Sequence, residues 1–195
     1  MNTLESELLI SSVQAAYRPR KSTADHIFVL QELFLEYRFN KFGKREGCIK
    51  KPLYLRFADL SKAFDKVLRN RMFRKLYNIG VKGKMHRVIK DMYTGNIANV
   101  LVDNCLTCDF EIKSGVLQGS KLGPILFLVY INDLLIDLQK SDLGAKLGDI
   151  SISCLGFADD IVLVSESPEH LQMLINMCQR WVQDKKWSLT QVSAK

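Results

Sequence analysis

Short apolar runs alternate along this chain with longer stretches in which apolar residues recur every three or four positions. The short runs, about 4–8 residues long, predict buried strands, and the periodic stretches predict amphipathic helices. The predicted order begins with a helix capped by Ser22 or Thr23, a strand at 53–60, and helices at about 66–78 and 84–93. A hairpin formed by 97–102 and 110–113, a helix at 122–138, a hairpin at 150–164 and a helix after the cap residue Ser167 follow. Strands on one sheet with helices packed behind them form an α+β layer architecture.

The apolar positions of each predicted helix are expected to face the core. These positions are Ile27, Leu30, Phe34 and Tyr37 in the first helix, Met85, Val88, Ile89 and Met92 in helix 84–93, Leu126, Val129, Tyr130 and Leu134 in helix 122–138, and Leu171, Leu174, Ile175, Cys178, Trp181 and Val182 in the last. The basic residues of helix 66–78 are expected on its surface: Arg69, Arg71, Arg74 and Lys75. Residues 40–51 are predicted to be a basic loop.

Two adjacent carboxylates interrupt the apolar run at residues 155–164 (LGFADDIVLV). Asp159 and Asp160 repel one another, and burial without partners would be costly. A hard divalent cation would remove the repulsion, whereas an exposed hairpin turn would avoid it. The upstream strand 53–60 (LYLRFADL) also ends near a carboxylate, Asp59, which could instead cap the next helix. If the three converge at one sheet edge, they can hold two Mg²⁺ ions roughly 4 Å apart.

Composition narrows the candidate functions only slightly. The chain has 195 residues, is 47% hydrophobic and carries a formal charge of +7. Its pI of about 9.2 suits a polyanionic partner. Its longest apolar run, 125–131, is too short to span a bilayer. Cys105 and Cys108 have zinc-knuckle spacing but lack a second ligand pair nearby, so we expect half-buried thiols and no structural zinc.

Four sequence blocks, in this order, resemble reverse transcriptases, and most closely those of non-LTR (LINE-type) retrotransposons. They are residues 14–23 (QAAYRPRKST), 57–65 (FADLSKAFD), 115–124 (GVLQGSKLGP) and 157–160 (FADD). The resemblance implies an RNA-directed DNA polymerase whose fold is a right-hand polymerase palm, an antiparallel sheet backed by helices, with part of the fingers. Ala16 and Leu117 depart from the family pattern, which normally has Gly and often has Pro at these positions.

The resemblance also implies roles for individual residues. Asp59, Asp159 and Asp160 would be the catalytic metal ligands for two Mg²⁺ ions, for which Mn²⁺ can substitute. The incoming nucleotide would lie against Leu60, Phe64, Gln118 and Gly119. Phe64 would exclude a 2′-hydroxyl, and its alternative is a core aromatic of the first helical turn.

Basic residues at both ends of the chain complete the predicted site. Arg18, Arg20 and Lys21 either contact template phosphates or form a solvated loop. Lys195 resembles a lysine that protonates the leaving pyrophosphate, although the spacing before it departs from the family pattern.

The implied organisation is a partial reverse transcriptase domain over 1–195. Residues 1–50 would be a fingers-side segment and 51–195 the palm, with the N-terminal fingers and the thumb outside the chain. Its partners would be an RNA template, a DNA primer and deoxynucleoside triphosphates. No membrane partner is expected, and an intracellular location in a retrotransposon particle, nuclear or cytoplasmic, is expected. The alternative is a catalytically incomplete fragment that only binds nucleic acid, and we expect weak binding and little polymerisation by the isolated chain.

Overall fold

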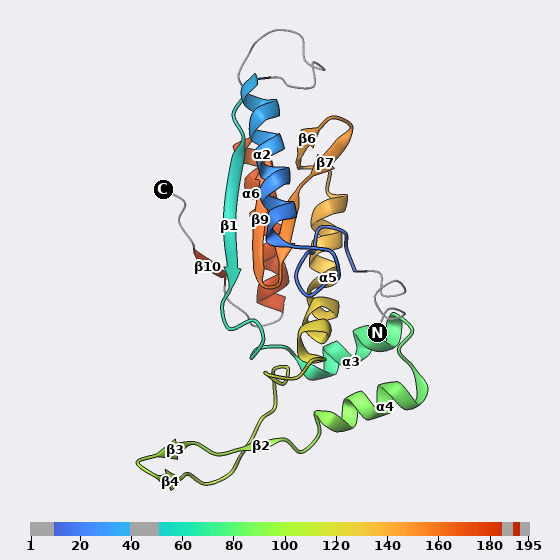
Figure 1. The fold of residues 1–195 in the computed structure, drawn as a ribbon, viewed down its shortest axis with the longest axis vertical. Coiled ribbons are helices and arrows are strands. Elements are labelled where there is room, and N and C mark those ends of the chain that lie inside the picture. Colours follow the sequence, from blue (N-terminus) through green and yellow to red (C-terminus); the bar gives the residue numbers. More distant parts are fainter. Residues whose placement is uncertain (1–9, 40–50, 185–188, 192–195) are drawn as a thin grey trace. The chain divides into compact units, whose positions relative to one another are not determined.

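In the computed structural model of this chain, residues 10–39, 51–184 and 189–191 are described (Figure 1). They form two compact units. The sheet unit contains the described residues up to Ser61 and from Ile131 onward, and the hairpin unit contains residues 62–130. No helix among the described residues is long and apolar enough to cross a membrane.

The sheet unit is built on four antiparallel strands in the order β10 (Leu189–Gln191), β1 (Tyr54–Leu60), β9 (Asp160–Ser165) and β8 (Cys154–Phe157). The central pair, β1 and β9, is in register from Tyr54 opposite Ser165 to Asp59 opposite Asp160. The apolar, partly β-branched side chains of these strands suit a pleated surface that is covered on both faces.

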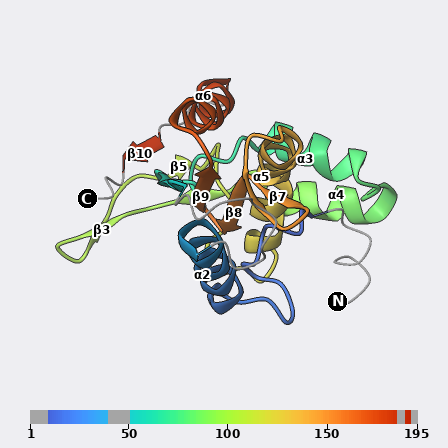
Figure 2. The same cartoon turned by 90° about the horizontal axis from the view of Figure 1, so that it is seen from above.

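Helices cover both faces of this sheet. Figure 2 shows α2 (Thr23–Phe39) and α6 (Pro168–Asp184) on opposite sides of β8 and β9. On the α2 face, Leu33 and Tyr37 pack with Val164 in one buried cluster. The Ser167 hydroxyl accepts a hydrogen bond from the N–H of His170 at 3.1 Å, which confirms the predicted cap of the last helix.

Two smaller elements complete the sheet unit. A separate hairpin, β6 (Ala145–Leu147) with β7 (Ile150–Ile152), packs near α2. The Asp-Asp hairpin is therefore shorter than the predicted 150–164, because residues 150–152 pair with 145–147 instead. The helix α5 (Gly123–Lys140) contributes its residues from Ile131 onward to this unit.

The hairpin unit contains the first half of α5, two short helices and two short ladders. The helices are α3 (Arg69–Asn78) and α4 (Gly83–Met92), and the ladders pair β2 (Ile97–Ala98) with β5 (Phe110–Glu111) and β3 (Leu101–Val102) with β4 (Cys105–Leu106). Asp103 and Asn104 both have positive φ, as a two-residue hairpin turn requires, so the predicted turn is confirmed.

Several predicted features of the helices need correction. The helix predicted from residue 66 begins at Arg69, because the carbonyls of Phe64 and Val67 bond to the backbone of the 115–116 segment instead of continuing a helix. Arg69 itself is buried rather than on the surface. On α2, Ile27 and Phe34 are exposed, and the buried side runs through Leu33 and Tyr37.

The predicted apolar side of α4 is mostly exposed as well. Only Ile89 of that set is buried, whereas Met85, Val88 and Met92 are 39–50% exposed. Cys105 and Cys108 are free and exposed rather than half-buried, because both faces of the β3–β4 hairpin are exposed. The predicted apolar sides of α5 and α6 are confirmed, and the predicted loop 40–51 lies almost entirely outside the described residues.

Candidate active site

The sheet unit places the three predicted carboxylates at one end of the β1–β9 pair. Asp59 on β1 lies directly opposite Asp160 on β9. Residues that are directly opposite in an antiparallel ladder have Cβ atoms about 5 Å apart and extend from the same face of the sheet. Asp159 precedes Asp160 in the two-residue turn that joins β8 to β9. The register of one strand pair therefore brings together residues a hundred positions apart in the sequence.

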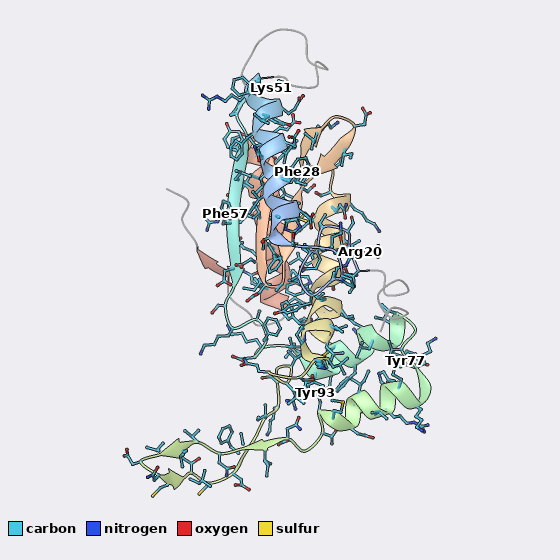
Figure 3. The ribbon with its side chains drawn as sticks, in the orientation of Figure 1. Arg20, Phe28, Lys51, Phe57, Tyr77 and Tyr93 are labelled. Atoms are coloured by element: carbon cyan, nitrogen blue, oxygen red, sulfur yellow. The ribbon has the colours of Figure 1, made fainter. Side chains whose placement is uncertain are left out.

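These carboxylates lie on an open part of the α2 face. Leu55 and Val162 extend from that face and pack against the cluster beneath α2. Phe57, two residues closer to Asp59, is 40% exposed, and Figure 3 shows it on β1. Because side chains alternate along a strand, Leu55, Phe57 and Asp59 share one face, and α2 covers only the part away from the carboxylates. A ligand can therefore reach Asp59 and Asp160.

Partial burial and mutual repulsion both act on the acidic pair. Burial raises the pKa of Asp159, a backbone hydrogen bond lowers it in part, and the charges of Asp160 and Asp59 raise it again. The pKa of Asp160 is raised by burial and then by the charge of Asp59. No basic side chain among the described residues offsets this repulsion. Repulsion between the ionised carboxylates therefore destabilises this site in the absence of a bound cation.

Carboxylate oxygens without basic partners are a donor set that suits Mg²⁺. Among the residues that the structure describes, no group of three or more His, Cys, Asp or Glu side chains is arranged to hold a metal ion. The backbone register fits a shared ion between the carboxylates, and the side chains would have to converge to bind it.

The turn between β8 and β9 has an unusual backbone and a buried partner. Ala158, the first of its two residues, has a φ of +57°. Gln14, fully buried, bonds both the N–H and the carbonyl of Ala158. Sequence reasoning assigned no role to this glutamine, although it is the first residue of the family block at 14–23.

The other predicted site residues of the sheet unit differ in how accessible their side chains are to a ligand. The side chain of Leu60 is fully buried, so only its backbone is available to a nucleotide. The Arg18 guanidinium donates to the carbonyls of Ser11 and Gln14, at 2.9 and 3.0 Å, and so braces its own segment. Arg20 (Figure 3) and Lys21 are exposed, and Lys195 lies outside the described residues.

The predicted nucleotide-contacting residues of the hairpin unit lie close to one another. The Gln118 side-chain amide donates to the carboxylate of Asp65 at 2.8 Å. The N–H of Val116 bonds the carbonyl of Phe64 at 2.9 Å, so the two segments run together. The ring of Phe64 stacks on Phe127, with centroids 4.4 Å apart. The 115–119 loop and the Phe64 segment therefore form one local structure.

Glycines allow this close approach. A Cβ at Gly115, which has a φ of +86°, would lie 2.9 Å from the Asp65 carbonyl oxygen. Gly119 also has a positive φ, of +81°, and lies exposed at the tip of the loop. Any other residue at Gly115 would push the loop away from the Phe64 segment.

Arg69 is a second residue that sequence reasoning missed. Its buried guanidinium donates to the carbonyls of Gly115, Tyr93 and Ile112, at 3.1, 2.8 and 2.6 Å. It also lies over the Tyr93 ring, 5.1 Å from the centroid. One cation thus joins α4, the base of the β2–β5 ladder and the loop that carries Gln118. A basic residue at a helix start gave no sign of burial, because such residues usually stay solvated.

One family model and several known proteins are similar in sequence to this chain. A family model described as "Reverse transcriptase (RNA-dependent DNA polymerase)" matches residues 1–192. The Pol polyprotein of the type-2 retrotransposable element R2DM of Drosophila melanogaster is 28% identical over 90% of this chain and 16% of its own length. The RNA-directed DNA polymerase of the mobile element jockey of Drosophila funebris is 28% identical over 69% of this chain and 14% of its own length. The chain thus spans about a sixth of the length of these relatives.

Solved structures share the fold. Apo telomerase of Candida tropicalis matches 97% of this chain and 34% of its own chain, with a TM-score of 0.67 and 12% identity. An RNA-dependent RNA polymerase of bacteriophage phi12 matches 85% of this chain and 28% of its own, with a TM-score of 0.53 and 12% identity. The fold is therefore that of a polymerase palm with part of the fingers, an antiparallel sheet backed by helices, as the sequence blocks predict.

Proposed function

Because this chain belongs to the reverse transcriptase family, and within it to the non-LTR retrotransposon type, we propose that it provides the catalytic carboxylates of an RNA-directed DNA polymerase. The reaction adds a deoxynucleotide to a primer 3′-hydroxyl on an RNA template. One observation carries the proposal: Asp59 and Asp160 face each other across β1 and β9, with Asp159 in the adjoining turn.

The three carboxylates fit the proposed metals. Asp59, Asp159 and Asp160 offer only oxygen donors, their repulsion is uncompensated, and their part of the sheet face is open. Two Mg²⁺ ions, or Mn²⁺ in their place, would supply Lewis-acid activation of the hydroxyl and neutralise triphosphate charge. The protein's contribution is to hold the carboxylates in register before substrate arrives, since positioning and charge neutralisation carry most of this chemistry.

The hairpin unit would supply contacts to the incoming nucleotide. Phe64 would close the 2′ side of the sugar, with its ring fixed by stacking on Phe127. Gln118 and Gly119 would lie along the nucleotide. For Leu60, in the sheet unit, any nucleotide contact would be made by the backbone. Gln118 has to leave its bond with Asp65 to reach a substrate. Because both groups are exposed, water can replace that bond at little cost.

The wider assignment follows from the same proposal. Residues 1–50 would belong to the fingers side and 51–195 to the palm. Arg20 and Lys21, both exposed, would contact phosphates of the RNA template or the DNA primer. Arg18 would act through its own segment rather than on nucleic acid. Lys195 would protonate the leaving pyrophosphate, and the protein would act inside the cell as part of a retrotransposon particle.

The test is primer extension on poly(rA)/oligo(dT) with deoxythymidine triphosphate and Mg²⁺. We expect weak extension by this chain that Asp159→Asn abolishes, together with Mn²⁺ binding that the same substitution weakens. If the unmodified chain and the Asp159→Asn variant both bind primer–template and neither extends it, the nucleic-acid-binding alternative is favoured. Absence of both Mn²⁺ binding and primer–template binding would contradict the proposal.

A further inference from the structure

Gln14 is a fully buried glutamine whose side chain makes three hydrogen bonds to the backbone. Its Oε1 accepts the N–H groups of Ala158 at 2.9 Å and of Ala16 at 3.0 Å. Its Nε2 donates to the carbonyl of Ala158 at 3.2 Å. A buried amide usually has partners, but here three hydrogen bonds serve only two residues, and Ala158 has two of them.

Ala158 needs this support because its backbone conformation is unfavourable. It is the first residue of a two-residue hairpin turn and has a φ of +57°. Glycine is the usual residue where such a turn needs positive φ at this place. A side chain there is strained, and such strain persists where the surroundings fix the backbone. Gln14 fixes both polar groups of this residue.

Gln14 can act as a fixed support because its own segment is anchored to the sheet. It forms a parallel bridge with Gly156, in which Ala15 donates to the Gly156 carbonyl and Gly156 donates to the Val13 carbonyl, at 3.0 and 2.9 Å. Arg18 braces the carbonyl of Gln14 from the other side. A Cβ added at Gly156 would lie 3.3 Å from Leu135 and 3.4 Å from the Gln14 amide nitrogen, so glycine suits this contact.

We propose that Gln14 is a positioning residue, which sets the direction of the Asp159 and Asp160 carboxylates by holding the Ala158 turn between the two strands. The inference rests on the proposed function of those carboxylates. Gln14 acts through the backbone, because it bonds both the N–H and the carbonyl of Ala158, and Asp159 is the next residue in the chain. Loss of the amide would let the turn relax and move the carboxylates relative to Asp59. A displacement of about 1 Å can cost roughly a hundredfold in rate.

The first test uses the metal-free chain and measures amide hydrogen exchange by NMR in Gln14→Met, which is similar in volume but cannot make these bonds. The amides of Ala158 and Ala16 should exchange at least about tenfold faster, because their acceptor is lost. The Val164 amide, which bonds the Ser153 carbonyl, should be unchanged. Gln172→Met, on the exposed surface of α6, is the matched control. Unchanged exchange at Ala158, or equal acceleration throughout the sheet unit, would overturn the proposal.

The second test separates positioning from general stability. Gln14→Met should weaken Mn²⁺ binding about tenfold and lower kcat for primer extension, with KM for primer–template within about twofold. Adding Ala158→Gly should restore a substantial part of the Mn²⁺ affinity, because glycine adopts positive φ without support. If Gln14→Met does not fold, Gln14→Glu replaces it, since the carboxylate keeps the acceptor and loses only the donor to the Ala158 carbonyl. Failure of the glycine to restore affinity would overturn the proposal.

The two tests also distinguish this proposal from the proposed function. If the unmodified chain neither binds Mn²⁺ nor extends a primer, the function fails, and no carboxylate remains to be positioned for it. If the unmodified chain does both and the Gln14 variants behave like the Gln172 control, the function stands and the positioning role fails. The exchange measurement is independent of metal and substrate, so it reports on the turn in either case.

Discussion

The two units of this chain hold their proposed functional residues in different ways. In the sheet unit, the carboxylates are fixed by strand register, so Asp59 and Asp160 are opposite each other because six residue pairs of β1 and β9 match. In the hairpin unit, the Gln118 loop is fixed by a few separate hydrogen bonds: backbone bonds to Phe64 and Val67, and one from Arg69 to the Gly115 carbonyl. The sheet unit buries the centre of its strands but exposes Ile27 and Phe34 on α2, whereas the hairpin unit exposes most apolar side chains of α4 and all of those on the β3–β4 hairpin.

This difference matches the demands of the proposed chemistry. Metal ligands must be positioned within a fraction of an ångström, and a register shared by two core strands provides that. Nucleotide contacts must admit and release a substrate at every step, and a short loop with an exposed Gln118–Asp65 bond can do so. The predictions below therefore replace single residues of each unit and compare the effects on activity and stability.

The largest effect is expected from Asp59→Asn. The substitution keeps the shape of the side chain and its place opposite Asp160, but removes a negative ligand. Loss of several kcal/mol of charge stabilisation should lower primer extension at least about a hundredfold. The matched control is Asp137→Asn, an exposed position on α5 in the same unit, which should leave activity unchanged. Comparable losses in both variants would mean that general charge, rather than the ladder position, matters.

Arg69→Met should most strongly disrupt the hairpin unit. It leaves three carbonyls, those of Gly115, Tyr93 and Ile112, without their donor, so we expect a loss of about 2–4 kcal/mol of local stability. Amide exchange at Val116 should accelerate accordingly, while amide exchange at Val164 in the sheet unit stays unchanged. Arg74→Met, exposed on the same helix, is the control. Equal stability of the two variants would show that Arg69 does not hold the loop.

Phe64→Ala tests sugar selection in the same unit. In a polymerase that contains this chain, we expect ribonucleotide incorporation to rise about tenfold relative to deoxynucleotide incorporation. Phe64→Tyr keeps the ring and should keep the selection. Phe127→Leu removes only the stacking partner and should change selection less. If discrimination is unchanged in Phe64→Ala, the ring serves packing alone.

The sequence predicted the type of most elements better than the side that each helix buries, for a physical reason. Strand periodicity and the caps of the long helices are local signals, so β1 and β9 were predicted as strands, and α5 and α6 as helices with the correct buried side, whereas α2 buries a different side from the predicted one. In α4, the same periodicity predicted a buried side that is exposed in the structure, since Met85 and Val88 contact no core there. An apolar stripe shows that a helix has an apolar side, without showing what covers it.

The carboxylate cluster was predictable, whereas its supports were not. Asp59, Asp159 and Asp160 stand out because charges rarely end core strands. Gln14 and Arg69 act by bonding backbone carbonyls and amides distant in sequence, and such partners leave no pattern in side-chain composition. The same holds for the positive φ of Ala158, because alanine gives no sign of a left-handed turn. The roles of these residues can be recognised only from the three-dimensional structure.

The smallest effect, on stability, comes from relieving repulsion at the metal site. The pKa of Asp160 in the folded chain is raised, by burial and by the charge of Asp59. A carboxylate whose pKa is raised on folding binds more protons in the native state, so stability is greater below the ordinary Asp pKa of about 4 and falls as pH rises through the folded value. The Asp160→Asn variant does not lose stability in this way as pH rises, because the amide does not ionise.

At pH 7 without metal, Asp160→Asn should therefore melt on the order of 1–3 °C above the unmodified chain, as removal of a like charge directly across a ladder implies. Below the ordinary Asp pKa the difference should shrink, since the Asp160 carboxylate, whose pKa is raised, is then largely protonated and uncharged. Saturating Mg²⁺ should raise the melting temperature of the unmodified chain more than that of the variant, because the ion removes the same repulsion that the substitution removes. Thermal melts across pH, with and without Mg²⁺, measure all three differences. A variant that melts lower at pH 7 without metal would show that the Asp160 carboxylate supports the fold, and that the strain lies elsewhere in the turn.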